Sequence, residues 1–211
     1  MFQERPIHYR VRHPQYNDYT LENDIALLRL ESPVNTSVYV PACLPGPGAD
    51  YVDKMVWVLG WGRLAESGQV ADTLQELEIK VVDDATCASA MGASSIFPAQ
   101  MICAGGELGK DGCQGDSGGP LMYNDQERWE LTGLTSWGIG CARQGLYGVY
   151  AEVTRKFVRT LHSYKNIFIF VTFQIIWIGS GTPFQTMSKI VTLIVTIFIV
   201  IDRSRVIEYS E

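Results

Sequence analysis

Short β-rich runs, broken by turn-forming residues, constrain the fold of this chain most strongly. They recur between residues 9 and 150 and are separated by glycine, proline, asparagine and aspartate. The runs lie at 25–30, 56–61, 74–82, 119–123, 129–137 and 148–153. Spacing of this kind is typical of an antiparallel barrel or sandwich, so we expect an all-β fold.

Two short helices are expected beside the strands. One covers DATCASAM at 84–91. The other begins at Thr154, which can cap a stretch whose Phe157, Val158 and Leu161 share one face. The chain contains no internal repeat and no P-loop motif, so a repeat architecture and a P-loop nucleotide site are excluded.

Composition limits the class of protein further. The chain has 211 residues, of which 46% are apolar and 19% charged, and this excludes a disordered chain. Its net charge of −6 offers no basic excess for a nucleic-acid partner. His8, His13 and His162 form no zinc pattern with the cysteines, so no metal site is expected.

The two ends of the sequence differ from its middle. The residues after Met1 are polar and do not form a signal peptide. After about Lys165 the chain becomes apolar, with runs at 167–178 and 190–201 of 12 residues each, shorter than the roughly 20 residues of a membrane-spanning helix. Isoleucine, valine, phenylalanine and threonine in these runs favour strand over helix. A membrane-inserted tail and a packed or artefactual tail both remain open.

The segment DGCQGDSGGP at 111–120 carries the strongest chemical signal. Its glycines permit a sharp turn and a close approach of substrate to the backbone, and Ser117 could attack a carbonyl. The N–H groups of Gly115 and Ser117 could stabilise the resulting oxyanion. One alternative is a glycine-rich hairpin with an idle serine. Another is the nucleophile elbow of α/β-hydrolases, which requires a helix after the serine, whereas the residues that follow favour a strand.

These ten residues closely resemble the active-site loop of the trypsin-like, chymotrypsin-fold serine proteases. Seven further segments resemble the family in the same order: HPQYN (13–17), NDIALLRL (23–30), PACLP (41–45), WVLGWG (57–62), MICAG (101–105), TSWGIGC (135–141) and GVYAEVT (148–154). The resemblance covers about residues 9 to 163. It implies a protein-cleaving hydrolase that works through an acyl-enzyme and uses no metal or organic cofactor.

The resemblance implies a trypsin-like double β-barrel divided unevenly along this sequence. Residues 1–55 would be a remnant of the first barrel with the interdomain linker, retaining about its last two strands. Residues 56–165 would form a complete second barrel with its C-terminal helix. Residues 166–211 form an apolar tail outside the resemblance. Strands without their barrel partners would leave open edges that favour association.

The family pattern assigns roles to several residues. Ser117 would be the nucleophile, Gly115 and Ser117 would form the oxyanion hole, and Asp24 would orient the catalytic histidine, although Asp24 could also be a turn residue. Asp111 matches the base of the specificity pocket, where a carboxylate favours arginine or lysine. Gly138 and Gly148 match the pocket walls, and Ser136, Trp137 and Gly138 would pair with an extended substrate.

The family also implies a pattern for the five cysteines. Cys87 would pair with Cys103, and Cys113 with Cys141. A third family disulfide is missing at both ends, where Val56 and Tyr123 stand instead. Cys43 belongs to neither of these two pairs. It would form a disulfide with an upstream light chain or stay a free thiol.

Two weaker signals concern a cation and a glycan. In the family, a tyrosine at the position of Tyr147 is associated with a sodium-binding loop, and the alternative is a surface tyrosine. Asn35-Thr36-Ser37 is a glycosylation sequon, which would matter in a secreted protein.

The sequence departs from the family in two catalytic features. No TAAHC-like histidine precedes Asp24, and we do not expect His8 or His13 to replace it. No IVGG-like N-terminus is present to pair with Asp116. We therefore expect an N-terminally truncated chain, inactive alone, of a secreted or extracellular protease. The alternative function is a non-catalytic protease homologue that binds or regulates partners.

Overall fold

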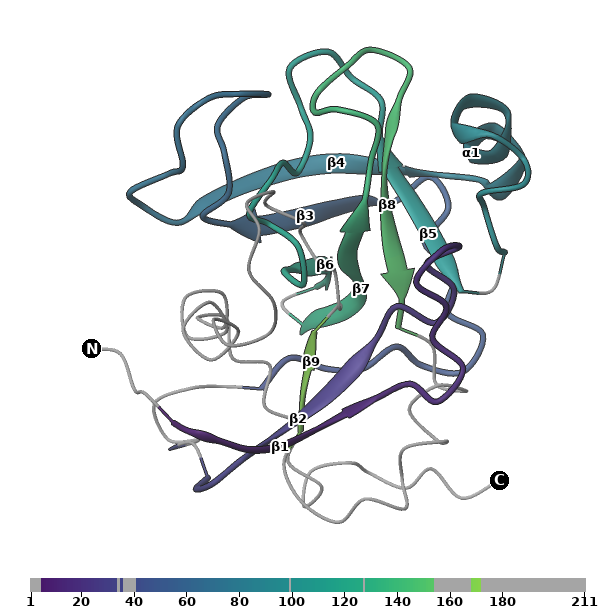
Figure 1. The fold of residues 1–211 in the computed structure, drawn as a ribbon. Coiled ribbons are helices and arrows are strands. Elements are labelled where there is room, and N and C mark those ends of the chain that lie inside the picture. The colour runs from purple at the N-terminus through teal and green to yellow at the C-terminus, as the bar shows by residue number, and fades with distance from the viewer. Residues whose placement is uncertain are drawn as a thin grey trace.

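The computed structural model describes residues 5–33, 35, 41–98, 100–126 and 128–153, and the backbone of 168–171. Within these residues the chain forms nine strands and one helix (Figure 1). In chain order they are β1 (Ile7–Arg12), β2 (Ala26–Leu30), β3 (Met55–Gly60), β4 (Gln75–Val82), α1 (Asp84–Met91), β5 (Met101–Gly105), β6 (Pro120–Asp125), β7 (Arg128–Trp137), β8 (Tyr147–Glu152) and β9 (Phe168–Val171).

Six of the strands close into a barrel in the order β3-β4-β5-β8-β7-β6. Every neighbouring pair is antiparallel. Closure occurs at β3, where Trp57 pairs with Glu78 of β4 on one side and with Met122 of β6 on the other. The expectation of an all-β fold with a closed barrel is thereby confirmed.

The barrel core packs around Tyr150 of β8, which is 1% exposed. Val56, Ile79 and Leu121 from three other strands share this cluster. A Cβ added to Gly133 of β7 would lie 3.1 Å from the Tyr150 Cβ. Glycine at this position therefore makes room for the large ring, which explains an otherwise unfavourable residue in mid-strand.

A second sheet has the order β1-β2-β9 and lies beside the barrel (Figure 1). Strand β2 is buried, and its Leu27 packs in one cluster with Leu131 and Leu134 of the barrel strand β7. Apolar contact, rather than backbone pairing, therefore attaches this sheet to the barrel.

Strand β9 comes from the first apolar run of the tail. Its residues 168–171 pair antiparallel with β2, with Ile169 opposite Leu28. The preference of that run for strand is thus confirmed for these four residues. The remainder of the tail and the helix expected from Thr154 fall outside the described residues, and the division at 55 and 165 stays a prediction.

Helix α1 occupies the residues that the sequence predicts. The Asp83 carboxylate caps it by accepting the Thr86 N–H at 2.9 Å, and Gly92, with φ of 98°, ends it. Cys87 and Met91 are its buried residues. No helix in the described part of the chain is long and apolar enough to span a membrane.

Truncating a core side chain should test this packing. Leu134→Ala, at a position with 0% exposure, should lower the free energy of unfolding by about 2–5 kcal/mol, because it removes buried apolar surface and leaves a cavity. Urea denaturation followed by tryptophan fluorescence measures the change. Leu64→Ala, at a 66% exposed position, is the matched control and should change stability by less than about 0.5 kcal/mol. Equal effects of the two substitutions would contradict the packing.

Candidate active site

Residues 111–119 are the second part of the connection between β5 and β6, and in them Ser117 lies between Gly115 and Gly118. Gly115 and Gly118 have φ of 102° and 80°, a conformation that side chains disfavour. The Gly118 N–H donates to the carbonyl of Thr135 on β7 at 2.9 Å. The half-buried Ser117 therefore lies in a loop whose backbone is attached to the barrel wall.

Asp116 connects this loop to the end of β3. Its Oδ1 accepts the Gly62 N–H at 2.7 Å, and its Oδ2 accepts the Cys113 N–H at 2.9 Å. A Cβ added at Gly60 or Gly62 would overlap the Asp116 carboxylate. The glycines of the WVLGWG segment thus have a physical role, because they let the carboxylate approach the backbone.

Asp24 and Ser136 form a buried hydrogen bond between the two sheets. Asp24 is 1% exposed and Ser136 is 2% exposed. The Ser136 Oγ donates to the Asp24 Oδ2 at 2.6 Å, although the residues are 112 positions apart. A buried carboxylate needs strong donors to offset its lost hydration, so this contact holds Asp24 at a defined place beside β7.

Asp111 lies where β8 leaves space for it. Its Oδ2 accepts the Ala142 N–H at 3.0 Å. A Cβ added at Gly148 would lie 3.0 Å from the Asp111 Oδ1 and 2.8 Å from the Tyr150 hydroxyl. A larger residue at 148 would therefore fill the space in front of this carboxylate.

Burial raises the pKa of Asp111, because desolvation disfavours the charged form, and the Asp116 carboxylate adds to the increase. Hydrogen bonds from Ala142 and Gly112 act in the opposite direction and lower that pKa. The Tyr150 hydroxyl is buried and has no hydrogen-bond partner among the described residues. A cation placed beside Asp111 would relieve part of this desolvation.

The end of β7 supplies the other predicted substrate residues. Ser136 and Trp137 are its last positions, and Gly138 follows directly. A Cβ added at Gly138 would meet nothing closer than the Gly140 carbonyl oxygen at 3.8 Å and the Tyr147 carbonyl oxygen at 3.9 Å. Space is therefore open in front of Gly138, whereas Gly148 lies close to the Asp111 carboxylate.

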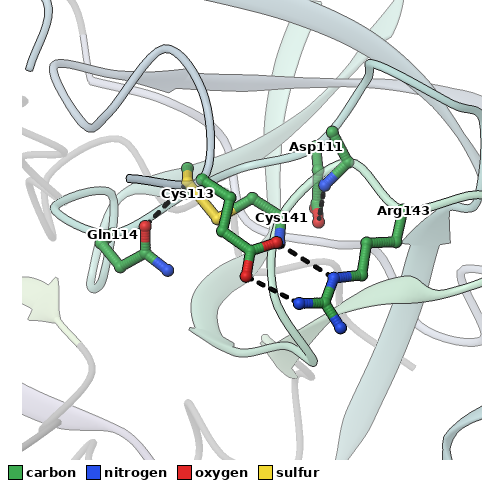
Figure 2. Close-up of polar contacts among 7 residues, drawn as sticks. Asp111, Cys113, Gln114, Cys141 and Arg143 are labelled. Carbon is green, nitrogen blue, oxygen red and sulfur yellow. Dashed lines mark hydrogen bonds and ion pairs between the residues drawn. A yellow bond between two sulfur atoms is a disulfide. The ribbon is translucent and has the colours of Figure 1, made fainter. Parts of the chain in front are cut away.

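Two disulfides support this region. Cys113 and Cys141 join the loop of Ser117 to the loop after β7, as Figure 2 shows. Cys87 and Cys103 join α1 to β5. Both are the pairs that the family resemblance implies.

Apolar side chains occupy the positions of the missing third disulfide. The register that pairs Trp57 with Met122 places Val56 opposite Tyr123. Val56 is fully buried, and Tyr123 packs against the same cluster. Hydrophobic contact therefore connects β3 and β6 at this point.

Cys43 is the free cysteine among the described residues. Its N–H donates to the Trp129 carbonyl at 2.8 Å, and its carbonyl accepts the Leu131 N–H at 2.9 Å. The thiol is half-buried on a backbone held against β7.

The two described histidines lie in β1 and directly after it. His8 lies within β1. His13 follows that strand, and its Nδ1 accepts the Gln15 N–H at 3.2 Å. Burial lowers the pKa of His13. Within the described residues no group of three or more His, Cys, Asp or Glu side chains could hold a metal ion.

Comparison with known proteins decides the family. A sequence model of the family named Trypsin matches residues 2–160, which is more than half of the chain. This chain belongs to the trypsin family of serine proteases. The resemblance stated from the sequence motifs is thereby confirmed.

Several curated members of the trypsin family are similar to this chain. Serine proteinase stubble of Drosophila melanogaster is 40% identical over 158 residues, which cover 72% of this chain and 20% of that protein. The suppressor of tumorigenicity 14 protein homolog of Bos taurus is 44% identical over 157 residues, covering 72% of this chain and 18% of the relative. Trypsin-1 of Astacus astacus is 44% identical over 146 residues, covering 68% and 61%. The chain therefore spans about a fifth of the first two relatives and less than two thirds of the third.

Within this trypsin-family chain, the structure brings the predicted residues together in part. Asp24 contacts Ser136 directly, and Asp111 lies against Gly148. The side-chain role of Ser136 was missed, because the sequence predicted only its backbone as a substrate contact. A hydroxyl aligned with a carboxylate 112 residues earlier leaves no signal in local spacing.

Removing the Ser136 hydroxyl should destabilise the protein at neutral pH. Ser136→Ala takes one hydrogen bond from the buried Asp24 carboxylate, and we expect a loss of about 1–3 kcal/mol in the free energy of unfolding. Urea denaturation measures it, with Ser94→Ala at an exposed position as the control. A loss no larger than that of the control would contradict the importance of the Asp24–Ser136 contact.

Proposed function

We propose that this chain carries the nucleophile and the specificity pocket of a serine endopeptidase that cleaves after arginine or lysine. The observation that carries the proposal is the half-buried Asp111 carboxylate, which faces Gly148 and belongs to the same loop as Ser117. Burial raises the pKa of Asp111, so a cationic ligand beside its carboxylate would be favoured.

In the proposed reaction, Ser117 Oγ attacks the carbonyl carbon of the scissile bond while a base takes its proton. The N–H groups of Gly115 and Ser117 stabilise the oxyanion. Collapse of the intermediate breaks the C–N bond, and the base returns the proton to the amine that leaves. Water then hydrolyses the acyl-enzyme and regenerates Ser117.

Substrate binding in this proposal uses three elements. The guanidinium or ammonium group lies against Asp111 in a charge-assisted pair. Gly138 and Gly148 leave room for its long side chain. The backbone of Ser136, Trp137 and Gly138 pairs with the substrate main chain as an added strand.

We propose that the base is a histidine outside these 211 residues, and that this chain alone is inactive. The backbone donor on His13 Nδ1 and the absence of a TAAHC-like segment support this. Cys43 would then bridge to an upstream light chain. A secreted location, a glycan on the exposed Asn35 and a sodium ion near Tyr147 remain parts of the proposal. The alternative is a non-catalytic homologue, which the missing histidine favours.

Catalysis by the isolated chain is directly testable. We expect the 211-residue chain to hydrolyse an arginyl ester no faster than background, because its sequence contains no TAAHC-like segment to supply the family's catalytic histidine. A fused upstream segment with a family-type histidine should restore turnover and labelling by a fluorophosphonate. Turnover by the isolated chain that Ser117→Ala abolishes would contradict the proposed inactivity. No labelling of the extended protein would favour the non-catalytic homologue.

The pocket is testable without catalysis. The cationic probe p-aminobenzamidine should bind the chain, and Asp111→Asn should weaken binding by about 10- to 100-fold, because the charge-assisted pair is lost. Fluorescence titration gives the Kd. Asp53→Asn removes the same charge from the exposed ion pair with Lys80 and should leave the Kd unchanged. Equal effects of the two variants would contradict the role of Asp111.

Binding of this probe should also depend on pH. Because the pKa of Asp111 is raised, its carboxylate protonates before exposed aspartates as the pH falls. Affinity should therefore drop at a pH above about 3.9, the ordinary value for aspartate. Titrations from about pH 3 to about pH 8 cover both sides of that ordinary value and locate the midpoint. A midpoint at or below the ordinary value would contradict the effect of burial.

A further inference from the structure

We propose that Glu66 is a positioning residue for the Asp111 pocket, because its carboxylate holds the turn at 140–143 against which Asp111 is hydrogen-bonded. The inference rests on the proposed function, since it concerns binding of a cationic side chain at Asp111. Glu66 is neither in the nucleophile loop nor in the pocket wall, and no role was assigned to it from the sequence.

Glu66 and Arg143 form a two-point ion pair. Figure 2 labels Arg143 and marks the two contacts of its guanidinium with dashed lines. The Arg143 Nη2 donates to the Glu66 Oε1 at 2.7 Å, and the Arg143 Nε donates to the Glu66 Oε2 at 3.0 Å. The same Oε2 accepts the Cys141 N–H at 3.3 Å. One carboxylate therefore contacts both a side chain and the backbone of the turn, so the turn is held at two points.

The turn itself is shaped for this contact. Gly140 has φ of 74°, and a Cβ there would lie 2.5 Å from the Arg143 Nε and 2.8 Å from the Glu66 Oε2. Only glycine therefore combines this backbone conformation with the close ion pair.

Glu66 is presented by a short hairpin that is itself anchored to the active-site loop. The Leu64 N–H donates to the Gln69 carbonyl at 3.0 Å, and Arg63 pairs with Val70. The Arg63 N–H donates to the carbonyl of Gln114, three residues before Ser117, at 2.9 Å. The hairpin thus contacts the nucleophile loop at one end and the 140–143 turn through Glu66.

The 140–143 turn contacts the pocket through Ala142. Ala142, between Cys141 and Arg143, donates its N–H to the Asp111 Oδ2 at 3.0 Å, and its carbonyl accepts the Gly109 N–H at 3.0 Å. A displaced turn would weaken the hydrogen bond that orients Asp111 and favours its ionised form. Asp116 and Tyr150 are the other titratable groups that act on Asp111, and within the described residues neither is hydrogen-bonded or ion-paired to Glu66.

The ion pair is exposed, with 40% of the Glu66 side chain and 53% of the Arg143 side chain accessible, so its effect on overall stability should be small. Its expected effect is local. The hydrogen bond to Arg143 lowers the pKa of Glu66, so its carboxylate stays ionised to lower pH than that of an unpaired glutamate.

Glu66→Gln in the full 211-residue chain should weaken p-aminobenzamidine binding about two- to fivefold. It should also move the pH midpoint of binding upward, because Asp111 loses support for its charged form. Asp53→Asn, which removes the same charge from an exposed ion pair elsewhere, should change neither quantity. Arg143→Gln should resemble Glu66→Gln, and the double variant should be no weaker than either single variant, because the two residues act as a unit.

The outcomes separate this inference from the proposed function. If the unaltered chain binds the probe and Asp111→Asn weakens binding as expected, while Glu66→Gln changes neither Kd nor midpoint, the inference is wrong and the pocket stands. Additive losses in the double variant would also overturn it, since they would show independent effects of Glu66 and Arg143. If the unaltered chain binds no probe, the proposed pocket fails and this inference fails with it.

Discussion

Closure of the six-stranded barrel is the constraint on which the rest of the structure depends. Because β3 pairs with both β4 and β6, none of the six strands has an unpaired edge. The proposed site residues lie at the ends of these strands or in the loops between them. Ser117 and Asp111 lie between β5 and β6, Ser136 at the end of β7, and Gly148 in β8. A shift in the register of any one pair would separate them.

Carboxylates concentrated at one end of the barrel are each held by donors from another segment. Asp24 accepts from Ser136, Asp116 from the amides of Gly62 and Cys113, and Asp111 from Ala142. The family pattern pairs Asp116 with an N-terminal amine, whereas within the described residues its carboxylate accepts hydrogen bonds from two backbone amides. Such contacts offset the desolvation of buried charge. At Gly60 and Gly62, where a Cβ would overlap the Asp116 carboxylate, the close approach also requires glycine.

Several elements could be predicted from the sequence because their causes are local. Helix α1 has a capping aspartate before it and a glycine after it. The strands from 56 to 61 and from 148 to 153 were predicted within one residue at each end, because apolar and β-branched residues there are bounded by turns. Strand β1 was not among the β-rich runs identified, since IHYRVR alternates half-buried and exposed residues with few strongly apolar ones.

The sequence by itself determined the family, the nucleophile loop and the cysteine pattern, because these depend on residue identity at short, ordered spacings. The tertiary structure alone decided three contacts. They are Ser136 with Asp24, Glu66 with Arg143 and the tail strand β9 with β2. Each contact joins residues at least 77 positions apart. Such contacts depend on how the barrel closes and on where its loops are anchored, and the local periodicity of the sequence does not encode either.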